Sequence, residues 1–349
     1  MRHSLPVRTS PSQLQAKAQA LLPAAAFDYL AGGAGQEVTL AANARAWAAH
    51  RFRPRVLRDV SGVDIATTVL GTPVALPILV APAAAQGLAH PEGELACARG
   101  AAAAGSLFTV SSRASHEFPA VAAASSGPLW FQVYVLRDRA ETARQVRAAC
   151  AANALALVLT VDAPYLGRRA RAADGLLLPS LTERPAHLEQ DPALTFEAID
   201  WLRRTSGLPV LCKGVLRGDD AVSCVEAGAA GVVVSNHGGR QLDRAIPTAQ
   251  ALTEVLAALA GRGEVYVDGG IQTGLDVLAA LALGARAVLV GRPVLWALAV
   301  GGAEAVADLL TGLGAEVAAG LALLGVSRLA DLSPDLVVPP DFAALAALP

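Results

Sequence analysis

The stretch Gly231-Val232-Val233-Val234-Ser235-Asn236-His237-Gly238-Gly239-Arg240-Gln241-Leu242-Asp243 joins an apolar run to a polar, glycine-rich one. Small and β-branched residues are typical of a buried strand, and the polar residues begin where that strand ends. His237 offers a base that titrates near neutrality, and Arg240 offers a planar fork that matches a carboxylate. The pattern indicates chemistry on a hydroxy acid, although the same histidine could be an ordinary hydrogen-bonded loop residue.

Seven further β-rich runs have the same form as 231–235. They lie at 77–81, 108–112, 130–135, 156–162, 209–213, 265–268 and 287–291. The chain between them carries helical amphipathic patterns, at 94–104, 138–151, 219–226, 248–260 and 273–283. Strands that alternate with helices predict a parallel sheet, and eight such units predict an α/β fold of the (β/α)8 TIM-barrel type. An open dinucleotide-binding sheet is disfavoured because no G-x-G-x-x-G follows the first strand.

The whole chain of 349 residues is interpreted as one domain. Residues 1–75 are predicted to form an N-terminal helical extension, with helical patterns at 12–21 and 24–30 and a turn at Gly32-Gly33-Ala34-Gly35. The barrel core is predicted at 76–300 and a C-terminal helical segment at 301–349. Residues 167–195, rich in Arg, Pro and Glu, have little apolar periodicity and are the candidate lid.

Composition excludes several classes of function. The chain is 54% hydrophobic and 17% charged with a formal net charge of −2, so no nucleic-acid-binding surface is expected. Neither a membrane span nor a secretion signal stands out. The four cysteines, Cys97, Cys150, Cys212 and Cys224, show no metal-ligand spacing, so no metal site is expected. They are interpreted as reduced packing residues of a cytoplasmic protein.

Polar residues gather where the predicted strands end, which is where barrel enzymes carry their active sites. A single polar residue at a strand end is usually a cap or a turn former, but a full ring of them favours an active site. The ring comprises Pro82, Ala83 and Ala84 after the first strand, Ser111, Gln132 with Tyr134, Thr160 with Asp162, Lys213, Ser235 with His237, Asp268-Gly269-Gly270, and Gly291-Arg292.

The last two strand ends suggest a phosphate site. Asp268-Gly269-Gly270 and Gly291-Arg292 supply backbone amides and a cation at the place where barrels commonly bind phosphate. Glycines after barrel strands are also common in tight turns. The sequence therefore predicts a phosphorylated cofactor, with ordinary tight turns as the alternative.

From residue 27 to beyond the last strand, the chain resembles the FMN-dependent 2-hydroxy acid oxidase and dehydrogenase family, which includes glycolate oxidase, lactate oxidase and 4-hydroxymandelate oxidase. The resemblance is carried by short motifs of which Ser235 to Asp243 is the most specific. The others are Phe27-Asp28-Tyr29, Phe52-Arg53-Pro54-Arg55, His90-Pro91-Glu92-Gly93-Glu94, Phe131-Gln132-Val133-Tyr134, Leu166-Gly167-Arg168-Arg169 and Gly291-Arg292-Pro293.

The resemblance implies catalytic and substrate-binding roles. His237 would accept the hydroxyl proton while the substrate α-carbon passes a hydride equivalent to the flavin, and Asp162 would orient the His237 ring. Arg240 and Arg169 would hold the carboxylate, helped by the hydroxyls of Tyr29 and Tyr134. The rival interpretation of Arg169 is a solvated surface charge, and that of Asp162 is a strand-end cap.

The resemblance also implies contacts to FMN. Lys213 would stabilise negative charge on the reduced flavin, although a buried structural ion pair is the alternative. Hydrogen bonds to the ring system would come from Ser111, Gln132, Thr160 and Ser235. Pro82, Ala83 and Ala84 would face the ring. The phosphate end would lie near Asp268, Gly269, Gly270, Gln272, Gly291 and Arg292.

This sequence departs from the family pattern at three places. Relatives commonly carry an arginine at the position of Gln272, so phosphate binding is expected to be weaker here. Arg113 stands where relatives carry an aromatic or apolar residue beside the substrate side group. That cation suggests a polar or anionic substrate, unless Arg113 points to solvent or pairs with Glu117. The lid is shorter than in glycolate oxidase, with no membrane-anchoring insertion.

The sequence therefore predicts a cytoplasmic FMN enzyme that oxidises an L-2-hydroxy acid to a 2-oxo acid, with O2 as acceptor and H2O2 as product. The alternatives are a dehydrogenase that uses another electron acceptor, a non-redox FMN isomerase, and a barrel that has lost FMN. The expected partner is a small hydroxy acid, with no nucleic acid and no membrane. Relatives are often tetramers, so a homo-oligomer is expected.

Overall fold

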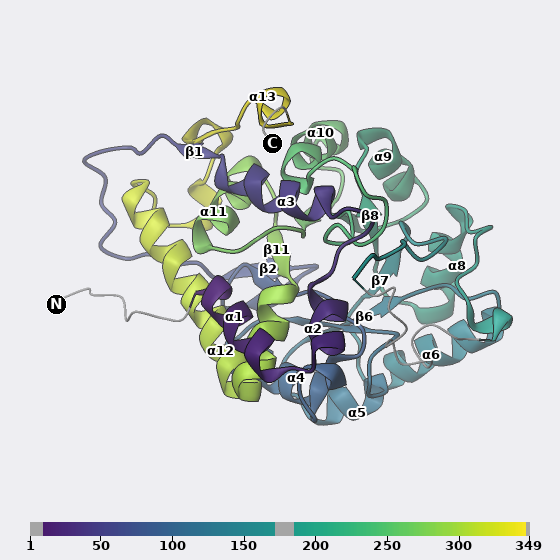
Figure 1. Cartoon of the computed structure of the whole chain (residues 1–349). Helices are drawn as coiled ribbons and strands as arrows, with labels where there is room; N and C mark the ends of the chain where they lie inside the picture. The colour runs from purple at the N-terminus through teal and green to yellow at the C-terminus, as the bar shows by residue number, and fades with distance from the viewer. Residues whose placement is uncertain (1–9, 172–184, 347–349) are drawn as a thin grey trace.

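The computed structural model describes residues 10–171 and 185–346, and its path is drawn in Figure 1. Eight parallel strands close into a barrel in the order β4 to β11, with β10 and β11 completing the circle to β4. The strands are β4 Ile78–Val80, β5 Phe108–Ser111, β6 Leu129–Val133, β7 Leu157–Thr160, β8 Val210–Val215, β9 Gly231–Val234, β10 Glu264–Val267 and β11 Ala287–Val290. The predicted (β/α)8 barrel is confirmed, with strand ends displaced by at most a few residues.

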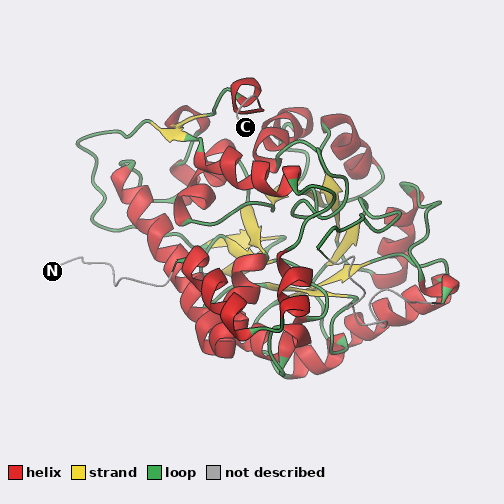
Figure 2. Cartoon of the chain, viewed as in Figure 1, coloured by secondary structure: helices red, strands yellow, loops and turns green. Residues whose placement is uncertain are grey.

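Helices surround the strands, as Figure 2 shows. The five segments between strands that were predicted to be helical form helices in the structure. The surrounding helices are α4 Gly93–Ala103, α5 Phe118–Ala123, α6 Arg139–Ala151, α8 Glu197–Ser206, α9 Gly218–Glu226, α10 Thr248–Leu259, α11 Gly274–Leu283 and α12 Arg292–Leu323. Short 3-10 turns lie at η1 Gln86–Leu88, η2 Ala186–Leu188, η3 Leu329–Asp331 and η4 Pro334–Leu336.

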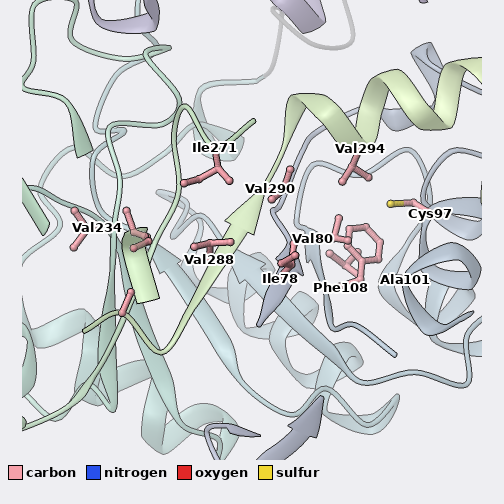
Figure 3. Packing of buried hydrophobic residues seen from close by; sticks show 14 of the residues in the cluster. Ile78, Val80, Cys97, Ala101, Phe108, Val234, Ile271, Val288, Val290 and Val294 are labelled. Atoms are coloured by element: carbon pink, nitrogen blue, oxygen red, sulfur yellow. The ribbon is translucent and has the colours of Figure 1, made fainter. Parts of the chain in front are cut away.

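Each barrel strand is buried on both faces, and its side chains alternate between two cores. One core lies between the sheet and the helices. Figure 3 shows part of it, where Ile78 and Val80 pack with Val288, Val290 and Phe108. The other core fills the barrel and contains Leu79, Trp130, Val158, Leu211, Val233, Tyr266 and Leu289.

This alternation explains why polar strand-end residues meet. A residue two positions after an interior apolar residue points to the same face of its strand. The pairs are Trp130 and Gln132, Val158 and Thr160, Leu211 and Lys213, Val233 and Ser235, and Tyr266 and Asp268. The polar members therefore cap the barrel interior at its carboxyl end.

A small hairpin closes the opposite end of the barrel. Its strands, β2 Thr67–Val69 and β3 Thr72–Val74, pair antiparallel. Val69 and Val74 belong to the same buried cluster as the interior residues near the starts of the strands, such as Leu107 and Ala287. Access to the barrel interior is thus confined to the carboxyl end.

The N-terminal extension wraps the barrel rather than forming a separate unit. Helix α1 (Pro11–Leu21) packs on α12, and α2 (Ala24–Ala31) contacts α12 as well. Helix α3 (Val38–Ala48) packs on α10 and α11, and in Figure 1 these purple elements lie along two sides of the barrel. Strand β1 (Arg51–Phe52) pairs with β12 (Val337–Val338), and α13 (Phe342–Ala346) contacts α3. The two ends of the chain thereby stabilise each other.

Helix α12 is long and apolar enough to cross a membrane by those two measures, with 44% of its most apolar window buried. Gly301 and Gly302 inside it have non-helical backbone angles, so it consists of two helices joined by a kink. Its buried side chains, such as Val294, Trp296 and Leu310, join the main core, and it packs on α4, α1 and α11. We therefore assign α12 as a packing helix of the barrel.

Candidate active site

A cavity of about 600 Å³ opens at the carboxyl end of the barrel. It brings together residues that were predicted at all eight strand ends and in the N-terminal extension. The predicted residues that line it are Tyr29, Pro82, Ala83, Ala84, Ser111, Arg113, Gln132, Tyr134, Thr160, Arg169, Lys213, His237, Arg240, Asp268, Gly269, Gly270, Gln272, Gly291 and Arg292. Asp162 and Ser235 do not line it, and both lie directly behind residues that do.

The loop after β9 aims His237 into the cavity. His237, Gly238 and Gly239 all have positive φ, at 58°, 61° and 74°. Histidine tolerates this left-handed region only when its surroundings hold it there. The His237 backbone N–H donates to Ser235 Oγ at 3.0 Å, and the Gly239 N–H donates to Asn236 Oδ1 at 3.1 Å. The polar residues of the motif therefore fix the unusual turn.

Asp162 and Tyr134 lie on either side of the His237 ring. His237 Nδ1 is 3.1 Å from Asp162 Oδ1, and Nε2 is 3.4 Å from the Tyr134 hydroxyl. Burial raises the pKa of Asp162, but the attraction and hydrogen bond of His237 and the charge of Lys213 outweigh it and lower the pKa. An ionised Asp162 can only accept, so Nδ1 donates to it, and Nε2 is the ring nitrogen on the side of Tyr134.

Glycine is required beside this pair. Gly214 has φ 113°, and a Cβ there would lie 2.5 Å from Asp162 Cγ. The register of β8 shifts between Lys213 and Val215, which is where this bulge lies. Gly214 thus makes room for the carboxylate and turns Lys213 toward the barrel axis.

Lys213 and Asp268 form a buried ion pair at 3.0 Å, with side chains only 4% and 9% exposed. Burial lowers the pKa of Lys213, but the charges of Asp268 and Asp162 outweigh it and raise the pKa. The Lys213 ammonium also donates to Ser235 Oγ at 3.0 Å. Ser235 was expected to contact the flavin, yet its hydroxyl is buried behind Lys213 and His237, where it supports both.

Three guanidinium groups gather on one side of the cavity. Arg169 and Arg240 both lie over the Tyr29 ring, at 5.4 Å and 5.2 Å. Burial and the neighbouring charges of Arg169 and Arg292 lower the pKa of Arg240 to about 9. Burial and Arg169 lower the pKa of Arg292 to about 10. No carboxylate among the described residues forms an ion pair with these three groups, so the cluster is suited to an anionic ligand.

Arg240 and Arg292 also hold the N-terminal extension. Arg240 Nη1 donates to the carbonyls of Tyr29 and Gly32. Arg292 donates to the carbonyls of Ala31, Gly32 and Gly238. The sequence analysis assigned Arg292 to phosphate alone and did not foresee this second role. The turn at residues 32–35 is therefore part of the site.

A row of hydrogen bonds crosses β5, β6 and β7. Ser111 Oγ donates to Gln132 Oε1 at 3.0 Å, and Gln132 Nε2 donates to Thr160 Oγ1 at 2.9 Å. All three side chains are at least 95% buried and line the cavity. They present an ordered line of donors and acceptors to a planar polar ligand.

The side of the cavity near β10 and β11 contains the predicted phosphate residues. Gly270 has φ 87°, and a Cβ there would lie 2.6 Å from the backbone of Asn43, so only glycine fits. Gly291 is the N-cap residue of α12, and no side chain caps that helix. Pro293 has no N–H and the Val294 N–H donates to the Gly291 carbonyl, so the backbone N–H of Arg292 is the donor that the first turn of α12 can offer to an anion. Gln272 lines this part of the cavity, and its backbone N–H donates to Asp276.

Arg113 lies at the edge of the cavity after β5. Its guanidinium stands 5.0 Å from the centre of the Tyr134 ring, and Nη2 donates to Gln190 Oε1 at 2.8 Å. The residue lines the cavity, in agreement with the interpretation as a ligand contact. The predicted lid falls partly outside the described residues. Its described beginning docks on the N-terminal extension, where Arg171 pairs with Glu37 at 2.5 Å.

Several supporting residues were missed by the sequence analysis. The side-chain amides of Asn43 and Asn236 bond each other reciprocally at 2.9 and 2.8 Å. Asp243 accepts from the backbone N–H groups of Gln36 and Thr39 at the start of α3. Asn236 and Asp243 belong to the motif Ser235 to Asp243, so the sequence could have indicated their supporting roles. Asn43 lies 193 positions away and has no local signature.

A sequence model of the family described as FMN-dependent dehydrogenase matches residues 18–339. This chain belongs to the FMN-dependent dehydrogenase family. L-lactate oxidase of Nostoc sp. is 46% identical over 88% of this chain and 92% of that protein. 4-Hydroxymandelate oxidase of Amycolatopsis orientalis is 44% identical over 90% and 94%. A crystal structure of mandelate oxidase matches with a TM-score of 0.90 and 44% identity, covering 95% of this chain and 98% of that one.

The predicted resemblance is thereby confirmed, and the cofactor of this family is FMN. One mandelate oxidase variant was determined with an FMN adduct. The cavity fits such a ligand on its own chemistry. Asp268 Oδ1 is buried without a hydrogen-bond partner among the described residues and can accept from a ligand hydroxyl. The polar row, the charge of Lys213 and the guanidinium of Arg292 can supply further contacts. The protein is an FMN-dependent oxidoreductase that acts on the CH–OH group of 2-hydroxy acids.

Proposed function

We propose that this protein oxidises an L-2-hydroxy acid to the 2-oxo acid and passes the electrons to O2, which leaves as H2O2. The arrangement of His237 Nε2 beside the cluster of Arg169 and Arg240 carries the proposal, because it sets a base next to a carboxylate site. The relatives with the names L-lactate oxidase and 4-hydroxymandelate oxidase favour an oxidase. Mandelate oxidase structures with (S)-configured ligands favour the L-enantiomer.

In this proposal each side chain has a separate role in oxidising the alcohol. Arg169 and Arg240 bind the substrate carboxylate, with Tyr29 and Tyr134 as further donors. Burial and the charge of Asp162 raise the pKa of Tyr134, so its phenol stays protonated and can donate. His237 Nε2 takes the hydroxyl proton, and Asp162 stabilises the imidazolium that results. Bound FMN supplies the acceptor for the two electrons and the hydrogen of the α-carbon.

Near the expected position of the FMN phosphate, this sequence departs from the family pattern at Gln272. Gln272 is neutral where the family pattern has a cation, so Gln272→Arg should tighten FMN binding. A hydrogen bond to a charged group contributes roughly 1.5–3 kcal/mol, or about tenfold to a hundredfold in the dissociation constant. Fluorescence titration of the apoprotein with FMN measures this change. Unchanged affinity would mean that position 272 does not reach the phosphate.

Arg113 should set the preference for the substrate side group. Its guanidinium lies beside Tyr134, close to the proposed base, so we expect a polar or anionic group at this side of the substrate. Arg113→Leu should shift kcat/KM toward apolar 2-hydroxy acids by about tenfold or more, because one charged contact is replaced by an apolar one. A panel of dicarboxylic, aromatic and aliphatic hydroxy acids tests this. The same rank order in both proteins would remove Arg113 from substrate recognition.

The electron acceptor is tested by admitting air to the substrate-reduced enzyme. An oxidase recovers its flavin colour rapidly and forms H2O2 equal to the 2-oxo acid produced. Slow recolouring, with fast recovery on adding a quinone or dye, would favour a dehydrogenase instead. A non-redox isomerase has no need of the His237 and Asp162 pair beside a guanidinium cluster.

We further propose that the protein is cytoplasmic and forms a homo-oligomer. Four free cysteines, three of them buried, agree with a reducing compartment. The tetramer is an expectation from the family resemblance. Light scattering of the purified holoprotein gives the mass, and a monomer would overturn the oligomer.

A further inference from the structure

Glu94 is a fully buried carboxylate outside the cavity, at 0% exposure near the start of α4. Its Oε1 accepts from the backbone N–H of Gln86 at 2.9 Å and from that of Ser115 at 3.0 Å. Gln86 lies in the loop after β4, and Ser115 lies in the loop after β5. One oxygen atom thus joins two βα loops at the carboxyl end of the barrel.

Two weaker contacts reinforce the same junction. The backbone N–H of Ala85 donates to the Arg113 carbonyl at 3.1 Å, and that of Gly87 donates to Ser115 Oγ at 2.9 Å. Ala85 has φ 54°, in the left-handed region that a non-glycine residue adopts only when its surroundings hold it there. The two hydrogen bonds to Glu94 Oε1 are part of that support.

These loops carry one wall of the cavity. Pro82, Ala83 and Ala84 line it immediately before the junction, and Arg113 lines it from the second loop. Two backbone N–H groups, one from each loop, bond the same buried oxygen, so the Glu94 side chain fixes the two loops relative to each other. A displacement of one ångström near reacting groups can cost a hundredfold in rate.

We propose that Glu94 is a positioning residue of this enzyme, which holds the Pro82–Ala84 wall and the Arg113 loop in register so that flavin and substrate meet correctly. The inference rests on the proposed function for its kinetic part. The second oxygen, Oε2, and Gln86 Oε1 are both buried without partners among the described residues. An amide at position 94 keeps an oxygen that can accept from the N–H groups of Gln86 and Ser115. Glu94→Gln should therefore preserve the junction.

The test compares three variants of the holoenzyme. Glu94→Ala should lower kcat/KM and raise the FMN dissociation constant, each by roughly tenfold to a hundredfold, since it leaves two backbone N–H groups without their shared acceptor. Glu94→Gln should restore both to within a few-fold of wild type. Ser115→Ala, a milder change at an exposed residue, should lower kcat/KM a few-fold.

Ser106→Ala is the matched control for loss of a buried hydrogen bond. Ser106 joins the same two strands at their opposite end, where Oγ donates to the Ile78 carbonyl at 2.7 Å. We expect this variant to lose thermal stability while keeping kcat/KM and FMN affinity. Wild-type kinetics and FMN affinity in Glu94→Ala, or equal kinetic losses in Ser106→Ala, would overturn the proposal. FMN affinity is measured without turnover, so it separates this result from a failure of the proposed reaction.

Discussion

His237→Ala keeps its flavin and loses about 10²–10⁴-fold in the rate at which a 2-hydroxy acid reduces it, which is the usual contribution of a positioned general base. The His237 ring lies between Asp162 and Tyr134 and makes no ion pair that supports the barrel elsewhere. Its removal should therefore spare the fold. Stopped-flow absorbance under nitrogen measures the reduction rate directly.

Asp162→Asn is the companion to that variant. This change keeps the volume of the side chain but removes the negative charge that stabilises the imidazolium. We therefore expect a smaller loss in the rate of flavin reduction than in His237→Ala. Near-normal reduction in His237→Ala would remove the base assignment. A colourless His237→Ala protein would instead show that the ring holds the cofactor.

Lys213→Met should have the largest effect on stability. The change leaves the Asp268 carboxylate buried without its cation, and breaking one side of a buried ion pair costs about 3–5 kcal/mol of unfolding free energy. Flavin reduction should also slow by at least tenfold, because the cavity loses a fixed positive charge. Urea unfolding and stopped-flow absorbance measure the two effects separately.

The double variant Lys213→Met with Asp268→Asn separates stability from chemistry. It removes both charges, so much of the lost stability should return, whereas the rate of flavin reduction should stay low. Unfolding free energy equal to wild type in the single variant would contradict a buried ion pair at this place. A wild-type reduction rate would assign Lys213 a structural role alone.

The barrel could be predicted because its determinants are local. Each strand is a short β-rich run, and the side-chain period of two places Gln132, Lys213 and Asp268 on the interior face of their strands. The pairing of β1 with β12 could not be predicted in the same way, because it joins segments far apart in sequence.

The catalytic residues of the site were predictable, and their supports were less so. The ring of polar strand ends indicated the cavity, and the pair of His237 and Asp162 forms as the resemblance implied. The supporting contacts of Ser235 and Arg292 were not predicted. Each side chain is held by backbone or side-chain partners that the local sequence does not reveal. Glu94 shows the same limit, since the motif His90 to Glu94 supported the family resemblance but did not indicate that this carboxylate joins two loops.

The visible spectrum of the purified holoprotein in the absence of air shows whether bound FMN oxidises a 2-hydroxy acid. Small, aromatic and dicarboxylic 2-hydroxy acids are added in turn to the oxidised protein. We predict a flavin absorbance that is bleached by the L-enantiomer of at least one of them, with formation of one equivalent of the 2-oxo acid. A bound flavin that none of these hydroxy acids bleaches would contradict it.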